Sequence, residues 1–337
     1  MSESGRGVRE MTRMQRLSIR FLVACTSAVL LAGCGKAADP GGERPAGNDA
    51  RTAAADDARP AGAPRTRRDC PPQLSAAADR GQGPVDDVVG IRPGMPWDDV
   101  VAILECRGDL RTFQTAETWS IRQNYGFPTR QLLRATDGVV CSEAEQRQAQ
   151  QAGCDTAGNR FEGVKEISEE FVVLFTGMPG EEIAQGVWRR TVFPADGYPA
   201  NSALVEALTE KYGSPLIQAS EMNHYNAAPR RGAALNLAWV YDTQGRMFAL
   251  NDAVGFRRDC TNGMKPWFGA AHSWNSGCGL TVRAEIMAVE GSRLMASSMD
   301  VMVINQAGLF NSSRAFEQAL ATAYEAKAKE NGRSPDL

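Results

Sequence analysis

The spacing of apolar residues along 70–337 predicts an α+β fold. Helical spacing of three and four residues occurs in 97–104, in 199–212 and in the stretch after 311–313. Short runs rich in β-branched and aromatic residues, which are typical of strands, separate these segments. The runs cover 88–91, 118–124, 161–175, 185–193, 235–241, 246–250, 280–289 and 293–304. We therefore expect antiparallel sheet, in one or more pieces, with a few packing helices.

Turn and cap residues refine this pattern. The predicted hairpin turns, rich in Gly, Asp and Pro, are 177–180, 242–245 and 290–292. Pro96 suits the first position of a helix, and Gly213 suits the end of one. The closing helix is expected to bury one stripe of residues: Phe316, Ala319, Leu320, Ala323 and Tyr324. Both 94–96 and 177–179 read Gly-Met-Pro, but their flanking periodicities differ, so no internal repeat is predicted.

Six cysteines within 70–337 indicate a disulfide framework, which is typical of an exported protein in an oxidising compartment. They permit 15 connectivities, of which we favour nearest-neighbour pairing. The expected pairs are Cys70–Cys106, Cys141–Cys154 and Cys260–Cys278. A metal site is disfavoured because the chain has no CxxC motif and its only histidines, His224 and His272, lie apart.

The pair Cys141–Cys154 constrains the segment between its members. Ser142 and Glu145 form a capping-box pattern and Gly153 is a natural terminator. A helix filling 142–152 would hold the two cysteines about 15–20 Å apart, whereas a disulfide needs Cα atoms about 4.4–6.8 Å apart. We expect a shorter helix after which the chain doubles back.

The amino terminus has the order of a secretory signal. Basic residues precede an apolar run, 21–31, that is too short to span a bilayer, which needs roughly 20 apolar residues. The run ends in Leu31-Ala32-Gly33-Cys34, which resembles the lipobox of bacterial lipoproteins. The resemblance implies cleavage before Cys34 and acylation of that cysteine, giving a stable anchor. Gly35 differs from the Asp of the enterobacterial inner-membrane sorting pattern, so the resemblance implies the outer membrane, facing the periplasm.

Residues 1–33 are then the signal peptide, and 34–69 are the lipidated cysteine followed by a linker. The linker is rich in Ala, Gly, Pro, Asp and Arg and has too little apolar bulk to fold. It predicts a disordered tether with a reach of about 30–35 Å. Residues 70–337 form the periplasmic α+β region, as one domain or as two with a boundary near 213–233.

Net charge argues against one class of partner. Removal of 1–33 leaves 32 basic and 38 acidic residues, a net charge of −6. This balance disfavours nucleic acid or a polybasic membrane contact. The expected partners are the membrane, through the lipid, and an envelope protein or cell-wall polymer.

The start of the folded region carries a second resemblance. Gly90-Ile91 and Gly94-Met95, followed by an acidic helix, resemble the opening of the SmpA/OmlA-like lipoproteins of the outer-membrane β-barrel assembly machinery. The resemblance covers 86–105, and it implies helices packed against an antiparallel sheet. The family has Thr or Ser where Pro96 stands here, is shorter and is not rich in cysteine.

No catalytic motif is present: the chain lacks a Gly-x-Ser-x-Gly elbow, a His-Glu-x-x-His motif and a phosphate-binding loop. Adjacent acidic and basic pairs, such as Glu169/Glu170, Glu181/Glu182 and Arg189/Arg190, are expected to be solvated. Calcium would require Asp155, Asn159 and Asp252 to be brought together. His224 is expected to be exposed and inert. No cofactor and no catalytic residue is assigned.

One segment stands out as a possible binding loop. Between Cys260 and Cys278 lie Trp267, Phe268, His272 and Trp274, and aromatic residues are favoured binding anchors. Their alternative role is to fold inward as a small core. We expect a non-enzymatic envelope lipoprotein that acts as a periplasmic binding or assembly module. The alternatives are an envelope or cell-wall hydrolase with an unrecognised site, and an inhibitor-like protein that uses this aromatic loop.

Overall fold

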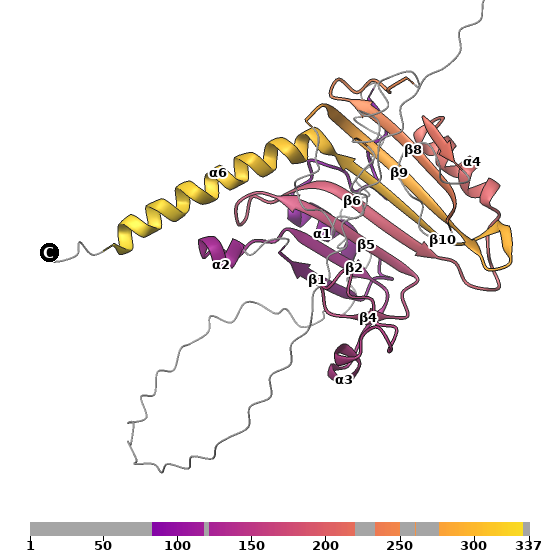
Figure 1. Cartoon of the computed structure of the whole chain (residues 1–337), viewed down its shortest axis with the longest axis horizontal. Coiled ribbons are helices and arrows are strands. Elements are labelled where there is room, and N and C mark those ends of the chain that lie inside the picture. The colour runs from indigo at the N-terminus through magenta and orange to yellow at the C-terminus, as the bar shows by residue number, and fades with distance from the viewer. Residues whose placement is uncertain (1–82, 118–120, 220–232, 250–259, 261–275, 333–337) are drawn as a thin grey trace, which may run out of the picture. The chain divides into compact units, whose positions relative to one another are not determined.

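The computed structural model describes residues 83–117, 121–219, 233–249, 260 and 276–332. Eight strands form one antiparallel sheet in the order β1-β2-β5-β6-β10-β9-β8-β7 (Figure 1). They are β1 (Thr112–Ala116), β2 (Leu132–Thr136), β5 (Glu169–Thr176), β6 (Ile183–Val192), β7 (Ile217–Ala219), β8 (Ala233–Asp242), β9 (Cys278–Val289) and β10 (Ser292–Asn305). The pair β3 (Val139–Val140) and β4 (Val164–Lys165) is separate. The described helices are α1 (Trp97–Glu105), α2 (Ile121–Tyr125), α3 (Glu143–Arg147), α4 (Asn201–Tyr212) and α6 (Gln306–Asn331). The fold is therefore α+β, as predicted.

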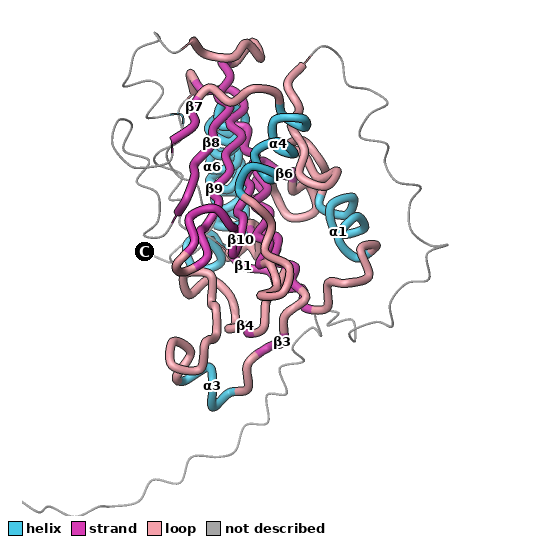
Figure 2. Tube along the Cα trace, turned by 90° about the vertical axis from the view of Figure 1, so that its right-hand side faces the viewer, coloured by secondary structure: helices cyan, strands magenta, loops and turns pink. Residues whose placement is uncertain are grey.

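Helices cover both faces of the sheet (Figure 2). Trp97, Val100 and Leu104 of α1 share a buried cluster with Leu208 and Tyr212 of α4, on what we call the α1/α4 face. The first turns of α6 pack on the opposite face, the α6 face, where Leu309 joins a second cluster with residues of β2, β5, β6 and β10. Since side chains alternate along each strand, four of the described strands, β2, β5, β6 and β10, contribute to both clusters.

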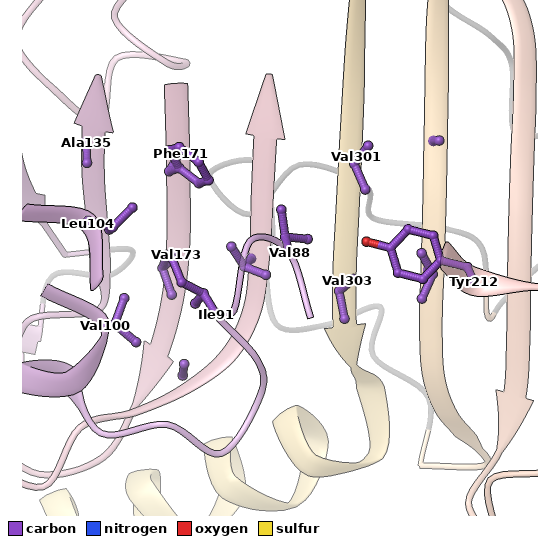
Figure 3. Packing of buried hydrophobic residues seen from close by; sticks show 14 of the residues in the cluster. Val88, Ile91, Val100, Leu104, Ala135, Phe171, Val173, Tyr212, Val301 and Val303 are labelled. Carbon is purple, nitrogen blue, oxygen red and sulfur yellow. The ribbon is translucent and has the colours of Figure 1, made fainter. Parts of the chain in front are cut away.

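A tight turn fills the space between α1 and α4. Val88 and Ile91 lie over the sheet between the α1 side chains and Tyr212 (Figure 3). Their backbones exchange hydrogen bonds of 2.9 and 3.0 Å. Val89 has φ of 52° and Gly90 has φ of 85°, as a type I′ turn requires. The Asp87 carboxylate holds the turn by accepting a hydrogen bond from the Gly90 N–H at 3.0 Å.

The chain is built from two halves with the same plan. Each half has a helix followed by four antiparallel strands: α1 with β1, β2, β5 and β6, then α4 with β7, β8, β9 and β10. The halves join through β6 and β10. From this join outward, the order is β6-β5-β2-β1 in the first half and β10-β9-β8-β7 in the second, so each half runs from its last strand to its first. No repeat was predicted from the sequence, and the fold shows one.

The register locates the pseudo-twofold relation. Pro96, just before α1, bridges to Ile183, and Ala200, just before α4, bridges to Met295. Ile183 and Met295 are therefore equivalent, and so are Arg189 and Val301, which follow them at the same distance along the chain. Arg189 and Val301 are also paired with each other across the join. One cross-strand row, here called the axial row, passes through this pair. Its members are Phe113, Ala135, Phe171, Arg189, Val301, Ala284, Leu237 and Gln218.

Several predicted elements agree with the structure. The hairpins β5–β6 and β9–β10 turn near 177–180 and 290–292, and α4 ends at Gly213. Gly213 has φ of 83°, which favours glycine because it lacks a Cβ atom. Pro96 is the N-cap of α1 rather than its first residue.

Three predictions about secondary structure were wrong. Residues 88–91 form the tight turn rather than a strand-like run. The strand expected at 118–124 is replaced, over its described part, by α2, whose Ile121 packs against Phe316 and Leu320 of α6. The closing helix begins before Asn311, since Asn305 caps it by accepting a hydrogen bond from the Gly308 N–H at 2.9 Å.

Two further predictions need smaller corrections. Tyr324 is 49 % exposed and lies on the outer part of α6 rather than in a buried stripe. The segment expected as a strand from 246 contributes only an isolated bridge from Met247 to Tyr241 within the described residues.

Disulfides join Cys141 to Cys154 and Cys260 to Cys278, with Cα atoms 6.4 and 5.5 Å apart, as nearest-neighbour pairing predicts. Cys106 is also disulfide-bonded, to a residue outside the described part. α3 is short and has the predicted capping box, so the chain doubles back. The two bridged excursions occupy equivalent positions, since one connects β2 to β5 and the other connects β8 to β9.

Candidate functional site

The base of the predicted aromatic loop is firmly held. Cys260 and Cys278 are fully buried and pack with Ala238 and Val240 on the α6 face. The backbone oxygen of Cys260 accepts hydrogen bonds from the hydroxyl of Thr281, at 2.9 Å, and from Nε2 of Gln306, the first residue of α6. The backbone at which the loop begins is therefore fixed by contacts with β9 and α6 and by a disulfide.

The residues named within that loop are not placed. Trp267, Phe268, His272 and Trp274 lie outside the described residues, as do His224, Asp252, Cys34 and Cys70. Their predicted roles stay predictions.

A row of charged residues crosses the centre of the α6 face. Glu170 of β5 lies directly opposite Arg190 of β6, Arg190 opposite Asp300 of β10, and Asp300 opposite Glu285 of β9. We call these four residues the charge ladder. Arg190 donates two hydrogen bonds to the Asp300 carboxylate, of 2.9 and 3.2 Å. Opposite charges in directly paired positions, such as Glu170 with Arg190 and Arg190 with Asp300, stabilise a sheet, whereas the like charges of Asp300 and Glu285 do not.

Beside the ladder lies a buried ion pair that the sequence did not reveal. Nε of Arg134 donates to the Glu170 carboxylate at 2.6 Å, and these side chains are 0 % and 1 % exposed. Nη1 of Arg134 donates to the backbone oxygens of Asp155 and Glu162, at 3.0 and 3.2 Å. Burial raises the pKa of Glu170 above its ordinary value, and the positive charge of Arg134 opposes this rise. The pair therefore ties the bridged excursion to the sheet.

Asp155 belongs to this charge network. Its carboxylate lies 3.6 Å from Nη1 of Arg190 and 3.9 Å from Nη2 of Arg134. Asn159, its suggested calcium partner, instead accepts a hydrogen bond from the Thr156 hydroxyl at 3.2 Å. Both side chains are therefore occupied by protein contacts.

A second buried carboxylate lies where β5 turns into β6. Arg130 donates two hydrogen bonds to Glu182, of 3.0 and 2.6 Å, and its guanidinium stands 4.5 Å above the Trp97 ring. Burial acts to raise the pKa of Glu182, but the hydrogen bonds and charge of Arg130, with the N–H of Gly180, bring it below its ordinary value.

These contacts correct the prediction that the adjacent charged pairs are solvated. Glu170 and Glu182 are buried, and Arg190 is mostly so. Glu169 lies on the other face, where Arg107 and Arg189 both contact it. Adjacent residues point to opposite faces of a strand, so each member of such a pair has its own environment.

The chemistry of these groups is that of structural ion pairs. Glu170, Glu182, Asp300 and Glu169 each contact an arginine. Within the described part of the chain, no three residues of the metal-binding types lie close enough together to hold a metal ion. Both histidines lie outside that part. The described charges therefore hold elements of the fold together.

Comparisons with known proteins give no relative. No family model matches the chain, no curated protein matches it, and no solved structure matches it. Among the described helices, none has the length and apolar character needed to cross a membrane.

Proposed function

We propose that the chain is an envelope lipoprotein, anchored through Cys34 to the outer membrane, whose folded part is a non-enzymatic binding module in the periplasm. The observation that carries the binding role is the clamped base of the 260–278 loop. Thr281 and Gln306 fix the backbone at Cys260, and the disulfide closes the loop at Cys278. A fixed base lowers the ordering entropy that a loop loses on binding.

The tether supports the same role. A linker of the composition of 35–69 behaves as a flexible coil with a reach of about 30–35 Å. Such a tether would let the folded part search for a partner near the membrane while the lipid keeps its local concentration high. The net charge of −6 after cleavage directs the expected partner away from nucleic acid.

The anchor is tested by membrane fractionation. Cys34→Ala removes the acylation site, so the protein should move from the membrane fraction to the soluble periplasmic fraction. Retention of the variant on membranes would refute the anchor.

The binding role is tested by cross-linking in cells, followed by mass spectrometry of the captured proteins. The prediction is recurrent capture of one envelope component, lost in the double variant Trp267→Ala/Trp274→Ala and kept in a control with exposed Leu294 changed to Ala. Capture that is equal in both variants would exclude the aromatic loop. Absence of any specific partner would count against a binding module.

A further inference from the structure

A groove of about 690 Å³ lies between α4 and the outer strands of the second half. It is on the α1/α4 face, opposite the α6 face that carries the charge ladder. Its lining residues are Ser202, Val205, Glu206, Thr209 and Glu210 of α4, with Gln218 of β7 and Leu235 of β8. Its volume is within the range of ordinary ligand sites, about 300–1,000 Å³.

The first half shows that the fold does not require this groove. Gln218 and Phe113 are the two end members of the axial row, so they are equivalent. Leu133 and Leu235 each stand two residues before a member of that row, and are equivalent too. Leu133 is only 2 % exposed, whereas Leu235 is half-buried. The outer-strand residues of the row also differ, since Phe113 is an aromatic residue that is 37 % exposed and Gln218 is an exposed glutamine.

The groove has a polar rim and an apolar floor. Glu206 and Glu210 stand one turn apart on α4, both exposed, and neither makes an ion pair with a described residue. Val205 and Leu235 supply the apolar surface. Side chains of Lys and Arg combine an aliphatic stem with a cationic head, which matches a floor of this kind below two carboxylates.

The strand beside the groove favours an extended ligand. β7 is the terminal strand of the sheet and has only three residues. Its outer backbone groups have no strand partner within the described part of the chain. An extended polypeptide can pair with such an edge while its alternate side chains enter the neighbouring pocket.

We propose that the groove between α4 and β7–β8 binds an extended, basic segment of a partner protein, with a Lys or Arg side chain lying over Val205 and Leu235 and its charge beside Glu206 and Glu210. The described residues that line this site do not include Cys260 or Cys278, and the test below does not involve Cys34. The proposal therefore holds or fails independently of the function proposed above.

The test uses the purified full chain and a fluorescein-labelled hexapeptide of alternating lysine and valine. Binding is measured by fluorescence anisotropy at about 0.01 M and about 0.15 M salt, over which the Debye length falls from about 30 to about 8 Å. A hexapeptide of alternating glutamate and valine is the ligand control. The basic peptide should bind, more weakly at the higher salt, and the acidic peptide should not.

Two variants locate the binding. Glu206→Gln/Glu210→Gln should weaken binding about two- to thirtyfold at low salt, as expected for two exposed ion pairs. Gln218→Phe places in the groove the ring found at the equivalent position of the first half, and should weaken binding at least about tenfold. The matched control is Glu317→Gln/Glu325→Gln, which removes two exposed carboxylates from α6 and should leave affinity unchanged. Near-ultraviolet circular dichroism checks the folding of each variant, and the glutamine variants keep the test valid if Gln218→Phe fails to fold.

Three outcomes would overturn the proposal. The first is no binding of the basic peptide at concentrations up to about 1 mM, a free energy weaker than about −4 kcal/mol. The second is binding that neither groove variant weakens. The third is binding seen only after residues 220–232 are replaced by glycine and serine, which would make this connection of the chain the occupant instead of a partner.

Discussion

Removing one partner of the Arg134–Glu170 pair should destabilise the fold more than removing both. Glu170→Leu leaves the fully buried Arg134 guanidinium without its hydrogen-bonded carboxylate, with the half-exposed Asp155 carboxylate 3.9 Å away as the remaining counter-charge. Breaking a buried pair in this way typically costs about 3–5 kcal/mol. Arg134→Met should cost about as much at neutral pH, because it strands the Glu170 carboxylate. The double variant removes both buried charges. It leaves the backbone oxygens of Asp155 and Glu162 without their donor, at about 1–3 kcal/mol, while Asp155 and Arg190 keep their contact with each other.

The two single variants should respond differently to pH. Burial already raises the pKa of Glu170 above its ordinary value, and Arg134 opposes that rise. In Arg134→Met the folded-state pKa of Glu170 is therefore higher still. A raised carboxyl pKa gives a stability contribution that is present below the unfolded value and lost as pH rises through the folded value. The penalty of Arg134→Met should thus shrink on acidification from about pH 7 to about pH 5. The penalty of Glu170→Leu should not, since an arginine stays protonated.

Urea unfolding at both pH values, with the disulfides intact, measures these effects. The exposed pair Glu143–Arg147, whose side chains are 96 % and 73 % exposed, is the matched control. Glu143→Leu and Arg147→Met should each change the free energy of unfolding by less than about 1 kcal/mol. If the double variant Arg134→Met/Glu170→Leu were as unstable as the sum of its single variants, the reasoning would be refuted. Equal pH dependence of the two single variants would refute the assignment of the raised pKa to Glu170.

Two further predictions concern local contacts. Hydrogen bonds from Lys165 and then Ser142 lower the pKa of Glu145 to about 2. The stability that the ionised Glu145 carboxylate contributes to the bridged excursion should therefore be present above about pH 4.5 and lost as pH falls through about 2. Carbon NMR titration should show that low value in the wild type and a rise toward 4.5 in Lys165→Met; a wild-type value near 4.5 would contradict the contact. Asn305→Ala removes the side chain that caps α6 and should lower the free energy of unfolding by about 1 kcal/mol, while Asn311→Ala, at an exposed position within α6, should not; urea unfolding distinguishes the two.

Local patterns predicted the elements whose stability is largely local. The hairpins β5–β6 and β9–β10 follow from runs of β-forming residues around Gly-containing turns, and α4 follows from its apolar spacing and Gly213. Residues 118–124 have the composition of a strand, yet Ile121 and Tyr125 become one face of a short helix that packs against α6. This choice depends on residues almost two hundred positions away, which a local pattern does not contain.

The charge ladder was missed for a related reason. Adjacent pairs such as Glu169/Glu170 and Arg189/Arg190 appear as exposed charge in a sequence. In the sheet, alternation sends Glu170 and Arg190 to the α6 face and Glu169 and Arg189 to the other, so each face gains its own ion pairs. Only the register between β5 and β6 shows which charges meet. The two cysteines marked the ends of the predicted binding loop in the sequence. The hydrogen bond from Gln306 to the Cys260 backbone oxygen could not be predicted, because Gln306 is distant from Cys260 in the sequence.

The structural repeat is not apparent in the sequence because equivalent positions of the two halves carry residues of different chemistry. Arg134 and Glu170 each directly precede a member of the axial row, and so do Asn236 and Arg283 in the second half. The buried Arg134–Glu170 ion pair is therefore equivalent to a hydrogen bond from Arg283 to the Asn236 side-chain oxygen, of 3.1 Å. Both contacts join the second and third strands of a half at the same place, with the acidic member replaced by a basic one. The residue types at these positions differ, so a sequence comparison does not relate them. The sheet requires only that two polar side chains form a hydrogen bond at this place. The end of the axial row differs in the same way, with Phe113 in the first half and Gln218, which lines the proposed ligand groove, in the second.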